Sequence, residues 1–344
     1  MKSLIYGYGI TGKSFERYLK AKNIEYDIFD DGIPEFKNIK SLNSYENIYC
    51  SPGIPRKIFN SLNSSNKVFT DIDIFFKEDK SIKIGITGTN RKSTTAFHLS
   101  QLIEIKHSVN LIGNIGEPML DHINNGSQYS VIELSSYQLD KMTENKLDFG
   151  VLLNIAPDHL DYHGSFQDYK TTKEKILTSV RSSNEADPYK LYKWVIGKDI
   201  KPLKLKSLPY RFERISESIV NDSKSTNMHS LKYALKKAIS YFKDQQFVLI
   251  TCGNPSKEQF SKISLEGPHE VLIYGSHVED IQKCITHPNK LAFNTLEDIL
   301  IYLKYKSGDQ NILFSPGYPS GDDYKNFEDR GNVFNDMVAK VMDD

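Results

Sequence analysis

The sequence predicts an α/β protein of three domains, and three observations carry this prediction. The chain has 344 residues, too many for one ordinary domain of about 100 to 150 residues. Short apolar runs typical of strands alternate with amphipathic helical patterns from the N-terminus onward. Several of those runs end in glycine-rich or polar loops, where open α/β sheets gather their ligand groups. We therefore expect domains over residues 1–80, 81–207 and 208–344.

The first domain is predicted from a strand, a glycine-rich loop, a helix and a second strand. Residues 2–6 form a short apolar run, residues 7–12 read GYGITG, and residues 13–22 space their apolar side chains like a helix. Residues 24–31, IEYDIFDD, alternate like a strand and end in acids, as in a dinucleotide-binding fold. One hypothesis is therefore an NAD-dependent oxidoreductase. The same loop also accepts other phosphates, including the diphosphate of a UDP-sugar.

The second and third domains are predicted from further apolar runs. In the second domain a strand leads through a polar loop into a helix, and two later strands break off into polar residues. These elements are expected at residues 81–87, 92–105, 129–136 and 149–157. In the third domain one amphipathic helix accompanies three strands. These are expected at residues 230–242, 247–253, 270–275 and 311–317.

Charge and cysteine content narrow the functional classes. Lys plus Arg and Asp plus Glu number 44 each, which argues against binding of nucleic acid or a membrane surface by bulk electrostatics. The three cysteines, Cys50, Cys252 and Cys284, are far apart, as in proteins of a reducing compartment. The apolar run at residues 2–6 is too short for a signal peptide. We expect a cytoplasmic monomer whose partners are small molecules, without nucleic acid or membrane.

The loop GITGTNRKST at residues 85–94 resembles a phosphate-binding loop. In such loops backbone N–H groups surround phosphate oxygens, a lysine offsets their charge, and a Ser or Thr hydroxyl ligates Mg²⁺. Lys92 and Ser93 occupy those last two positions, directly after the predicted strand. Ile86 and Arg91 stand where the general pattern has glycine. Arg91 would cost about 1 kcal/mol if the backbone there needs a positive φ.

Acids and histidines follow the next two predicted strands. Glu133 ends one of them, and Asp158, His159, Asp161 and His163 follow the other. An isolated Glu or His is more often a solvated surface residue. At adjacent strand ends beside a phosphate loop, however, carboxylate and imidazole groups make a plausible site for one or two divalent cations.

At these residues the sequence resembles the Mur ligases, whose phosphate loop reads TGTNGKST. The loop here, TGTNRKST, differs only at Arg91. Further blocks occur in the family's order: GYGITGKS, SPGIP (51–55), GNIG (113–116), ELSSYQLD (133–140), LNIAPDHLDYHGSFQDYKTTK (153–173), LPYRFE (208–213), NDSKSTN (221–227) and SPGYPSGDDYKNFEDRG (315–331). The resemblance covers most of the chain. It implies a Rossmann-like N-terminal domain for a UDP-substrate, a P-loop-type central ATPase domain and an α/β C-terminal domain for an amino acid.

The resemblance also implies a reaction. ATP would phosphorylate the carboxylate of UDP-N-acetylmuramoyl-L-alanine, and the amine of D-glutamate would displace the phosphate, in peptidoglycan precursor synthesis. The catalytic residues implied are Lys92, Glu133, His159 and Lys173. Ser93, Glu133, His159 and Lys173 would hold one or two Mg²⁺ ions, with a carbamate on Lys173.

The resemblance further assigns binding residues to each substrate. ATP would be bound by Gly88, Thr89, Asn90, Arg91, Lys92, Ser93, Thr94, Arg211 and Asp222. The UDP-substrate would be bound by Gly9, Ile10, Thr11, Gly12, Asp30, Ser51, Gly53, Asn114 and Ser136. D-Glutamate would be bound by Lys224, Thr226, Lys257, Ser320 and Phe327. An arginine fork suits phosphate, and an aspartate suits the hydroxyls of a ribose.

Three departures from the family pattern bear on ATP. They are Arg91, Pro157 in place of an acid, and a short segment at residues 181–207 that lacks the family's His-Asn-x-x-Asn helix. The central domain is therefore predicted to be truncated, with its adenine pocket rebuilt or absent. The alternative hypothesis is a weakened relative that binds the UDP-muramyl precursor without efficient ATP turnover.

Overall fold

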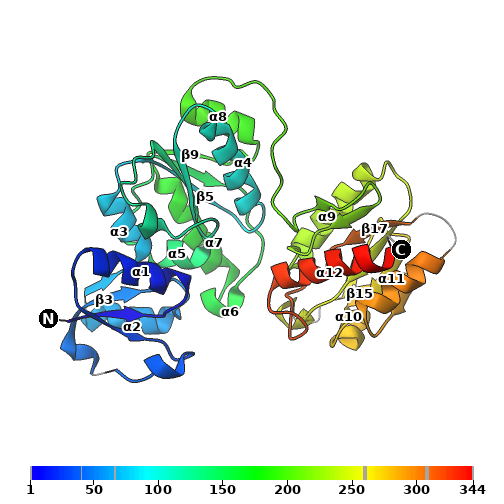
Figure 1. Ribbon diagram of the computed structural model, residues 1–344, viewed down its shortest axis with the longest axis horizontal. Coiled ribbons are helices and arrows are strands. Elements are labelled where there is room, and N and C mark those ends of the chain that lie inside the picture. Colours follow the sequence, from blue (N-terminus) through cyan, green and yellow to red (C-terminus); the bar gives the residue numbers. More distant parts are fainter. Residues whose placement is uncertain (1, 40, 66, 259–261, 307–309, 343–344) are drawn as a thin grey trace. The chain divides into compact units, whose positions relative to one another are not determined.

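The structure is a computed structural model that describes residues 2–39, 41–65, 67–258, 262–306 and 310–342 (Figure 1). The chain divides into two compact units, Met1–Lys206 and Ser207–Asp344. The first unit contains a four-stranded and a five-stranded sheet, and the second contains a six-stranded and a two-stranded sheet. The predicted α/β class is therefore confirmed. The boundary near residue 80 stays a prediction, because both sheets of the first unit belong to one compact body.

The first sheet has the strand order β2-β1-β3-β4, and all its pairings are parallel. Its strands are β1 (Lys2–Tyr6), β2 (Tyr26–Phe29), β3 (Tyr45–Cys50) and β4 (Lys67–Phe69), and its helices are α1 (Ile10–Ala21) and α2 (Arg56–Ser65). Helix α1 begins inside the glycine-rich loop, three residues earlier than expected, with Gly9 as its N-cap. A Cβ at Gly12 would lie 2.2 Å from the Gly7 carbonyl oxygen, so the close approach of loop and helix requires glycine.

The second sheet has the order β6-β7-β5-β8-β9 and is also parallel throughout. Its strands are β5 (Ile82–Thr87), β6 (Val109–Gly113), β7 (Tyr129–Glu133), β8 (Phe149–Leu152) and β9 (Arg181–Ser183). Its helices are α3 (Asp71–Glu78), α4 (Lys92–Glu104), α5 (Ser136–Lys141), α6 (Leu160–His163), α7 (Phe166–Glu174) and α8 (Pro188–Ile196). Because the strands are parallel, the loops after β5, β7 and β8 emerge at one edge of the sheet.

The segment 181–207 forms a short edge strand and one helix. Strand β9 pairs with β8, and helix α8 packs against α4 (Figure 1). Trp194 of α8 contacts Phe149 edge-on at 5.0 Å between ring centroids, and Arg181 lies over both rings. This segment therefore completes the core of the second sheet.

The main sheet of the second unit has the order β10-β11-β17-β12-β14-β16, with only the β10–β11 pair antiparallel among its described pairings. Its strands are β10 (Glu213–Arg214), β11 (Ile219–Asn221), β12 (Phe247–Thr251), β14 (Glu270–Ile273), β16 (Lys290–Ala292) and β17 (Asn311–Phe314). Strands β13 (Ile263–Ser264) and β15 (Ile285–Thr286) form the small sheet. The helices are α9 (Met228–Tyr241), α10 (Val278–Cys284), α11 (Leu296–Tyr305) and α12 (Phe327–Met342).

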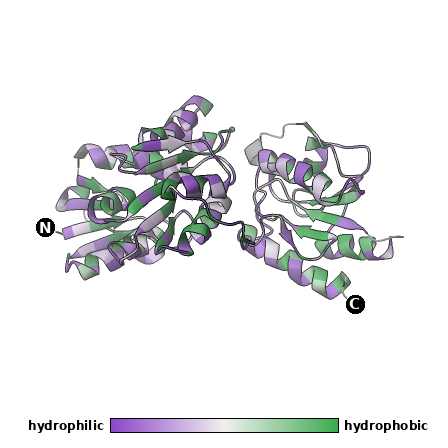
Figure 2. Ribbon diagram, turned by 90° about the horizontal axis from the view of Figure 1, so that it is seen from above, coloured by the Kyte–Doolittle hydropathy of each residue, from purple (hydrophilic) through white to green (hydrophobic). Residues whose placement is uncertain are grey.

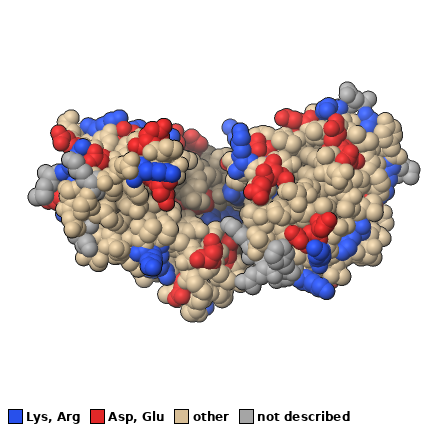
Figure 3. All heavy atoms as spheres, turned by 90° about the horizontal axis from the view of Figure 1, so that it is seen from below, with Lys and Arg blue, Asp and Glu red and all other residues tan. Residues whose placement is uncertain are grey.

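Both units bury apolar strands between layers of helices. In the second unit α9 and α10 pack into one core, and α11 and α12 pack into the other. The strands are mostly green in Figure 2, whereas the helices also carry hydrophilic residues. Acidic and basic side chains are interspersed over the surface visible in Figure 3. The remaining short helices are η1 (Pro34–Phe36), η2 (Leu42–Ser44), η3 (Met119–His122), η4 (Lys175–Thr178) and η5 (Pro255–Glu258). Among the described residues, none of the helices has the length and apolar character needed to span a membrane.

Candidate active site

The predicted phosphate loop connects β5 to α4, as the sequence indicated. Arg91 is the N-cap of α4 and has φ 69° and ψ 1°, in the left-handed region. The loop therefore does require the conformation that favours glycine, and Arg91 adopts it at a cost of about 1 kcal/mol. The side chain of Asn154 holds the loop, since its Oδ1 accepts from Asn90 N and its Nδ2 donates to Asn90 O, both at 2.9 Å.

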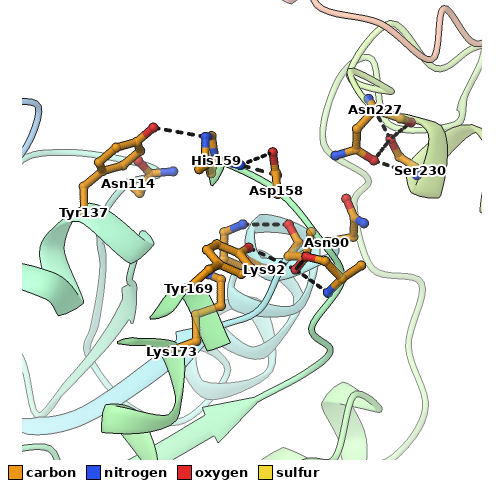
Figure 4. A network of polar contacts seen from close by, with 12 residues as sticks. Asn90, Lys92, Asn114, Tyr137, Asp158, His159, Tyr169, Lys173, Asn227 and Ser230 are labelled. Atoms are coloured by element: carbon orange, nitrogen blue, oxygen red, sulfur yellow. Dashed lines mark hydrogen bonds and ion pairs between the residues drawn. The ribbon is translucent and has the colours of Figure 1, made fainter. Parts of the chain in front are cut away.

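Lys92 and Tyr169 both contact Thr89 of this loop. Lys92 Nζ donates to the Thr89 carbonyl oxygen at 2.9 Å, and the Thr89 hydroxyl lies 3.0 Å from the Tyr169 hydroxyl (Figure 4). The Thr89 hydroxyl also accepts from Ala156 N at 2.9 Å. Contacts from the segment after β8 and from α7 therefore fix the shape of the loop.

Glu133 ends β7 beside the loop and is 1% exposed. Its Oε1 accepts a hydrogen bond of 2.9 Å from Asn114 Nδ2. Its Oε2 is buried, and no described residue bonds to it. A buried carboxylate oxygen without a partner is costly unless a cation lies beside it. Glu133 therefore suits a hard divalent cation, which prefers oxygen ligands.

Lys173 lies in the last turn of α7 and is 1% exposed. Its Nζ donates to the Thr87 hydroxyl at the end of β5, at 3.2 Å, and lies 5.0 Å from the centroid of the Tyr169 ring. Burial holds the pKa of Lys173 well below its usual value, and the charge of Lys92 lowers it further, against the opposing effects of Asp158 and Glu133. Lys92 and Glu133 are thus electrostatic neighbours of Lys173.

The histidines of the predicted metal cluster lie in different surroundings. His159 has φ 52° as N-cap of α6, and its Nδ1 lies 3.0 Å from the Tyr137 hydroxyl (Figure 4). His163 is 2% exposed, packs against the rings of Tyr162 and Tyr169, and has no hydrogen-bond partner for either ring nitrogen among the described residues. Burial lowers the pKa of His163 to about 4, so this ring is neutral at pH 7.

The donor set for a metal ion is sparse. In the described part of the chain, no three His, Cys, Asp or Glu side chains come together as a metal site. Ser93, in the first turn of α4, is 6% exposed. Glu133 suits one cation, because a single carboxylate leaves room for the phosphate oxygens and water that Mg²⁺ prefers, and Ser93 stays a predicted ligand of that ion. His159 and Lys173 stay predicted ligands of a second ion.

Most of the residues predicted for the UDP-substrate lie around the carboxyl end of the first sheet, whereas Asn114 follows β6 and Ser136 begins α5, both beside the second sheet. Gly9 to Gly12 form the N-terminus of α1, where free N–H groups suit a phosphate. Asp30 accepts hydrogen bonds from Tyr8 N at 2.6 Å and Gly32 N at 2.9 Å. The Ser51 hydroxyl donates to Gly7 O at 2.7 Å. Gly53 lies in the turn before α2, Asn114 contacts Glu133, and the Ser136 hydroxyl is buried with no hydrogen-bond partner in the described part of the chain.

A polar seam, which the sequence did not reveal, joins the first sheet to α5 and α6. Arg56 of α2 donates to both carboxylate oxygens of Asp140, at 2.9 and 2.5 Å. Lys141 is 3% exposed and donates to Pro52 O and to the Tyr162 hydroxyl, both at 2.7 Å. We define this seam as Arg56, Asp140, Lys141 and Tyr162. It fixes the turn that carries Ser51 and Gly53 against the helix that follows Glu133.

In the second unit, two residues predicted to bind ATP meet at one turn: Arg211 belongs to it, and Asp222 bonds to its backbone. Arg211 stands between Tyr210 and Phe212, which have φ 57° and φ 54°. Asp222 Oδ1 accepts from Phe212 N at 2.8 Å, and its Oδ2 accepts from the Ser315 hydroxyl at 2.9 Å. Desolvation raises the pKa of Asp222 to about 7. Asp222 thus supports the strained turn that presents Arg211.

The residues predicted for D-glutamate lie on loops at the carboxyl end of the second unit's sheet. Lys224 and Thr226 follow β11, Ser320 follows β17, and Phe327 begins α12. Lys224 Nζ lies 3.7 Å from the centroid of the Phe327 ring. Lys257 lies in η5 after β12, and its side chain is outside the described residues.

Several supporting residues escaped sequence reasoning, among them Tyr137, Asn154, Tyr169, Lys141 and Arg330. Tyr169 and Asn154 lie inside a recognised block, so a search for partners of the loop would have found them there. Arg330 likewise lies inside the recognised block at residues 315–331. For Lys141, just outside a block, the sequence offers no signal that distinguishes it from a solvated surface lysine.

The fold and the site define an α/β protein with a P-loop-type phosphate site at the carboxyl edge of a parallel sheet. Residues 86–272, more than half of the chain, match the family described as the Mur ligase middle domain. The chain belongs to the Mur ligase family, and it is a ligase that forms carbon–nitrogen bonds. Its architecture is the three-domain Mur ligase architecture, with a shortened central domain.

Relatives and solved structures agree with this assignment. The chain is 28% identical to the UDP-N-acetylmuramoylalanine--D-glutamate ligase of Francisella tularensis strain SCHU S4, over 99% of this chain and 96% of that protein. The alignment spans 408 positions, so the relative contains segments that this chain lacks. The MurF ligase of Thermotoga maritima in complex with ADP superposes with a TM-score of 0.59 and 14% identity, covering 89% and 99% of the two chains. A pseudomurein peptide ligase type C from Methanothermus fervidus gives 0.56 and 14%, covering 99% and 100%.

Proposed function

We propose that the chain is an ATP-dependent ligase that joins D-glutamate to UDP-N-acetylmuramoyl-L-alanine in peptidoglycan precursor synthesis. The observation that carries the proposal is the convergence of Lys92, Glu133 and Lys173 where β5 and β7 end. Relatives named for this activity align with nearly the whole chain. The chain would act on small molecules, in the cytoplasm and as a monomer.

The chemistry needs concentrated positive charge. A carboxylate oxygen of the muramyl substrate attacks the γ-phosphorus of ATP, which forms an acyl phosphate and releases ADP. The amine nitrogen of D-glutamate then attacks the acyl carbon, the amide forms, inorganic phosphate leaves, and the nitrogen gives up a proton. Both steps bring anions together, so fixed cations stabilise their transition states.

Residues of the first unit would supply this charge. Lys92 would offset the β- and γ-phosphates, while N–H groups of residues 88–94 would bind their oxygens. Ser93 and Glu133 would hold Mg²⁺, with His159 and Lys173 at a second ion. A bound Mg²⁺ supplies charge stabilisation at the transferred phosphate. The lowered pKa of Lys173 favours its neutral amine, the form that can react with CO₂ to give the predicted carbamate.

The proposal assigns each substrate to its own set of residues. Gly9, Ile10, Thr11, Gly12, Asp30, Ser51 and Gly53 would bind the UDP moiety, and Asn114 and Ser136 would bind the muramyl part. Arg211 and Asp222 would bind ATP. Lys224, Thr226, Lys257, Ser320 and Phe327 would bind D-glutamate, whose two carboxylates need cationic and hydroxyl donors.

The test is a reconstituted reaction with purified protein, ATP, Mg²⁺, UDP-N-acetylmuramoyl-L-alanine and D-glutamate. Phosphate release should require both co-substrates, and mass spectrometry should detect the glutamyl product. L-Glutamate and D-alanine serve as controls for configuration and for the second carboxylate. Release of no phosphate with any amino acid would contradict the proposal, and binding of the UDP-substrate without ATP turnover would favour the weakened-relative alternative.

A further inference from the structure

Arg330 is the largest fully buried side chain of the protein's described part, and its role is unexplained by the assignments above. It lies in the first turn of α12 and is 0% exposed. A buried guanidinium normally has a carboxylate partner, because its desolvation is costly. Here the guanidinium donates to neutral oxygen atoms of the described residues, a hydroxyl and two backbone carbonyls.

These hydrogen bonds reach two different loops at the carboxyl end of the sheet. Arg330 Nε and Nη2 donate to the Ser223 hydroxyl and the Ser223 carbonyl oxygen at 3.1 and 2.7 Å. Nη1 donates to the carbonyl oxygen of Tyr318 at 3.0 Å. Ser223 directly precedes Lys224, and Tyr318 lies two residues before Ser320. A single planar side chain therefore joins the loop after β11 to the loop after β17.

A third loop and the start of α12 close around the same group. A Cβ at Gly253, after β12, would lie 2.2 Å from Pro319 O and 3.1 Å from Arg330 Nη1, and Gly253 has φ 109°. Asn254 N donates to Pro319 O at 3.0 Å. The Ser223 hydroxyl donates to Phe327 O at 2.8 Å. The guanidinium thus lies where every loop with a predicted D-glutamate residue meets.

We infer that Arg330 is a positioning residue of the amino-acid site, which fixes the three loops after β11, β12 and β17 and selects an amino acid with two carboxylates. This inference rests on the proposed function. The planar fork sets the distance between Lys224 and Ser320 through hydrogen bonds to their loops. No carboxylate of a described residue bonds to this guanidinium, whose charge adds to the positive end of the α12 dipole, so an anion is favoured at the loops.

The decisive variant is Arg330→Lys in the full chain, because lysine keeps the charge but loses the fork. Hydrogen exchange of backbone amides in residues 222–226, 253–256 and 316–320 should accelerate about tenfold or more. Exchange in residues 2–206 should not change. Lys340→Met is the matched control, since Lys340 lies on the same helix but is exposed and ion-paired with Glu297. Acceleration confined to α12, or no acceleration, would overturn the inference.

Kinetics provide a second readout that a merely structural role would not reproduce. In Arg330→Lys the KM for D-glutamate should rise about tenfold, and the KM values for ATP and the UDP-substrate should stay within about twofold. The preference for D-glutamate over D-alanine should shrink. An equal rise of all three KM values would overturn the inference. If Arg330→Lys fails to fold, Ser223→Ala removes two of the hydrogen bonds, keeps the charge, and should give the same pattern.

The exchange measurement separates this inference from the proposed function. If the wild-type chain ligates no amino acid, the proposed function fails, while loop exchange still reports on what Arg330 holds together. If the wild-type chain is active and the variant keeps wild-type exchange and KM for D-glutamate, only the inference fails.

Discussion

Arg91 shows how one side chain can occupy a backbone position that favours glycine. Its φ of 69° is the conformation that the phosphate loop requires at the N-cap of α4. Helix α4 still begins at the next residue, and Asn154 and Tyr169 hold the loop in this shape through their contacts with Asn90 and Thr89. The substitution therefore changes the charge of the loop more than its shape.

We expect Arg91→Gly to keep activity within several-fold and to raise the free energy of unfolding by at most about 1 kcal/mol. Relief of the positive φ is partly offset by the greater freedom of glycine in the unfolded chain. Thermal unfolding and steady-state kinetics are the measurements. Arg91→Ala keeps the strain and removes the charge, so it separates the two effects. ATP turnover that appears only in the glycine variant would instead mean that Arg91 blocks the phosphate site.

Glu133→Gln should raise the Mg²⁺ concentration for half-maximal activity by about tenfold or more. The buried Oε2 would lose its negative charge and become a poor ligand for a divalent cation. Thermal stability without Mg²⁺ should not fall, because the variant removes a buried charge. The measurement is a Mg²⁺ titration of activity, with exposed Glu144→Gln as control. An unchanged Mg²⁺ requirement would contradict the ligand role.

Asp222 should make stability depend on pH between about 4 and 7. Its pKa rises from 3.8 to about 7 in the fold. The folded chain therefore holds this proton more tightly than the unfolded chain, and the stabilisation from protonation is lost as pH rises through that range. Asp222→Asn removes the titration, so its free energy of unfolding relative to wild type should be higher at pH 8 than at pH 5. Denaturant unfolding at both pH values measures this, and equal differences would refute it.

At the level of secondary-structure elements, the seam of Arg56, Asp140, Lys141 and Tyr162 links α2 to α5 and α6. The bidentate Arg56–Asp140 pair is only partly buried, so its contribution is discounted for solvent screening. The seam also positions the turn with Ser51 and Gly53. The sheet proposed to bind the UDP-substrate and the sheet proposed to carry the chemistry therefore share one set of contacts.

A double-mutant cycle of Arg56→Met and Asp140→Asn should give a coupling energy of about 1–2 kcal/mol in unfolding experiments. The KM for the UDP-substrate should rise in each single variant, while the KM for ATP changes less. The exposed Lys193–Asp199 pair in the same unit is the control cycle and should couple by less than about 0.5 kcal/mol. Equal coupling in both cycles would show that the seam contributes no more than a surface ion pair.

For the whole molecule, the main departure from its relatives is length. The segment after Lys173 folds as β9 and α8 and completes the core of the second sheet. Glu185, Asp187, Lys190 and Lys193 of this segment form surface ion pairs or helix caps. This segment therefore closes the second sheet with one short strand and one helix.

We expect this chain to discriminate weakly between ATP and GTP, with kcat/KM values within about tenfold. A pocket discriminates strongly only when it supplies hydrogen bonds that the wrong base leaves unpaired. The predicted phosphate ligands are common to both nucleotides, whereas the family's helix that contacts the nucleotide is absent from the sequence. The measurement is kinetics with each nucleotide at saturating D-glutamate. A preference for ATP of a thousandfold or more would show that the adenine pocket has been rebuilt.

Local sequence patterns were enough to predict the α/β class and the phosphate loop, and to recognise the ordered sequence blocks shared with the Mur ligases. Strands β1, β5, β12, β14 and β17 could be predicted because their apolar runs are buried and bounded by glycine or polar residues. The sequence patterns did not predict strands β3, β6 and β11, because polar residues interrupt them. Glu46 of β3 is exposed, whereas Asn110 of β6 and Asn221 of β11 bond to partners from elsewhere in the fold.

Contacts between distant residues could be assigned only from coordinates. The pattern of charged residues along the chain cannot separate Lys141 and Arg330, which are buried, from solvated lysines and arginines, because burial depends on which loops meet above them. The same holds for Glu133. Only the coordinates show that Asn114 bonds to its Oε1 and that its buried Oε2 has no partner among the described residues. The sequence by itself therefore determined which residues are candidates for phosphate chemistry. The tertiary structure decided their charge, their hydrogen-bond partners and the distances between them, because the desolvation and hydrogen bonds that set these properties come from other segments of the chain.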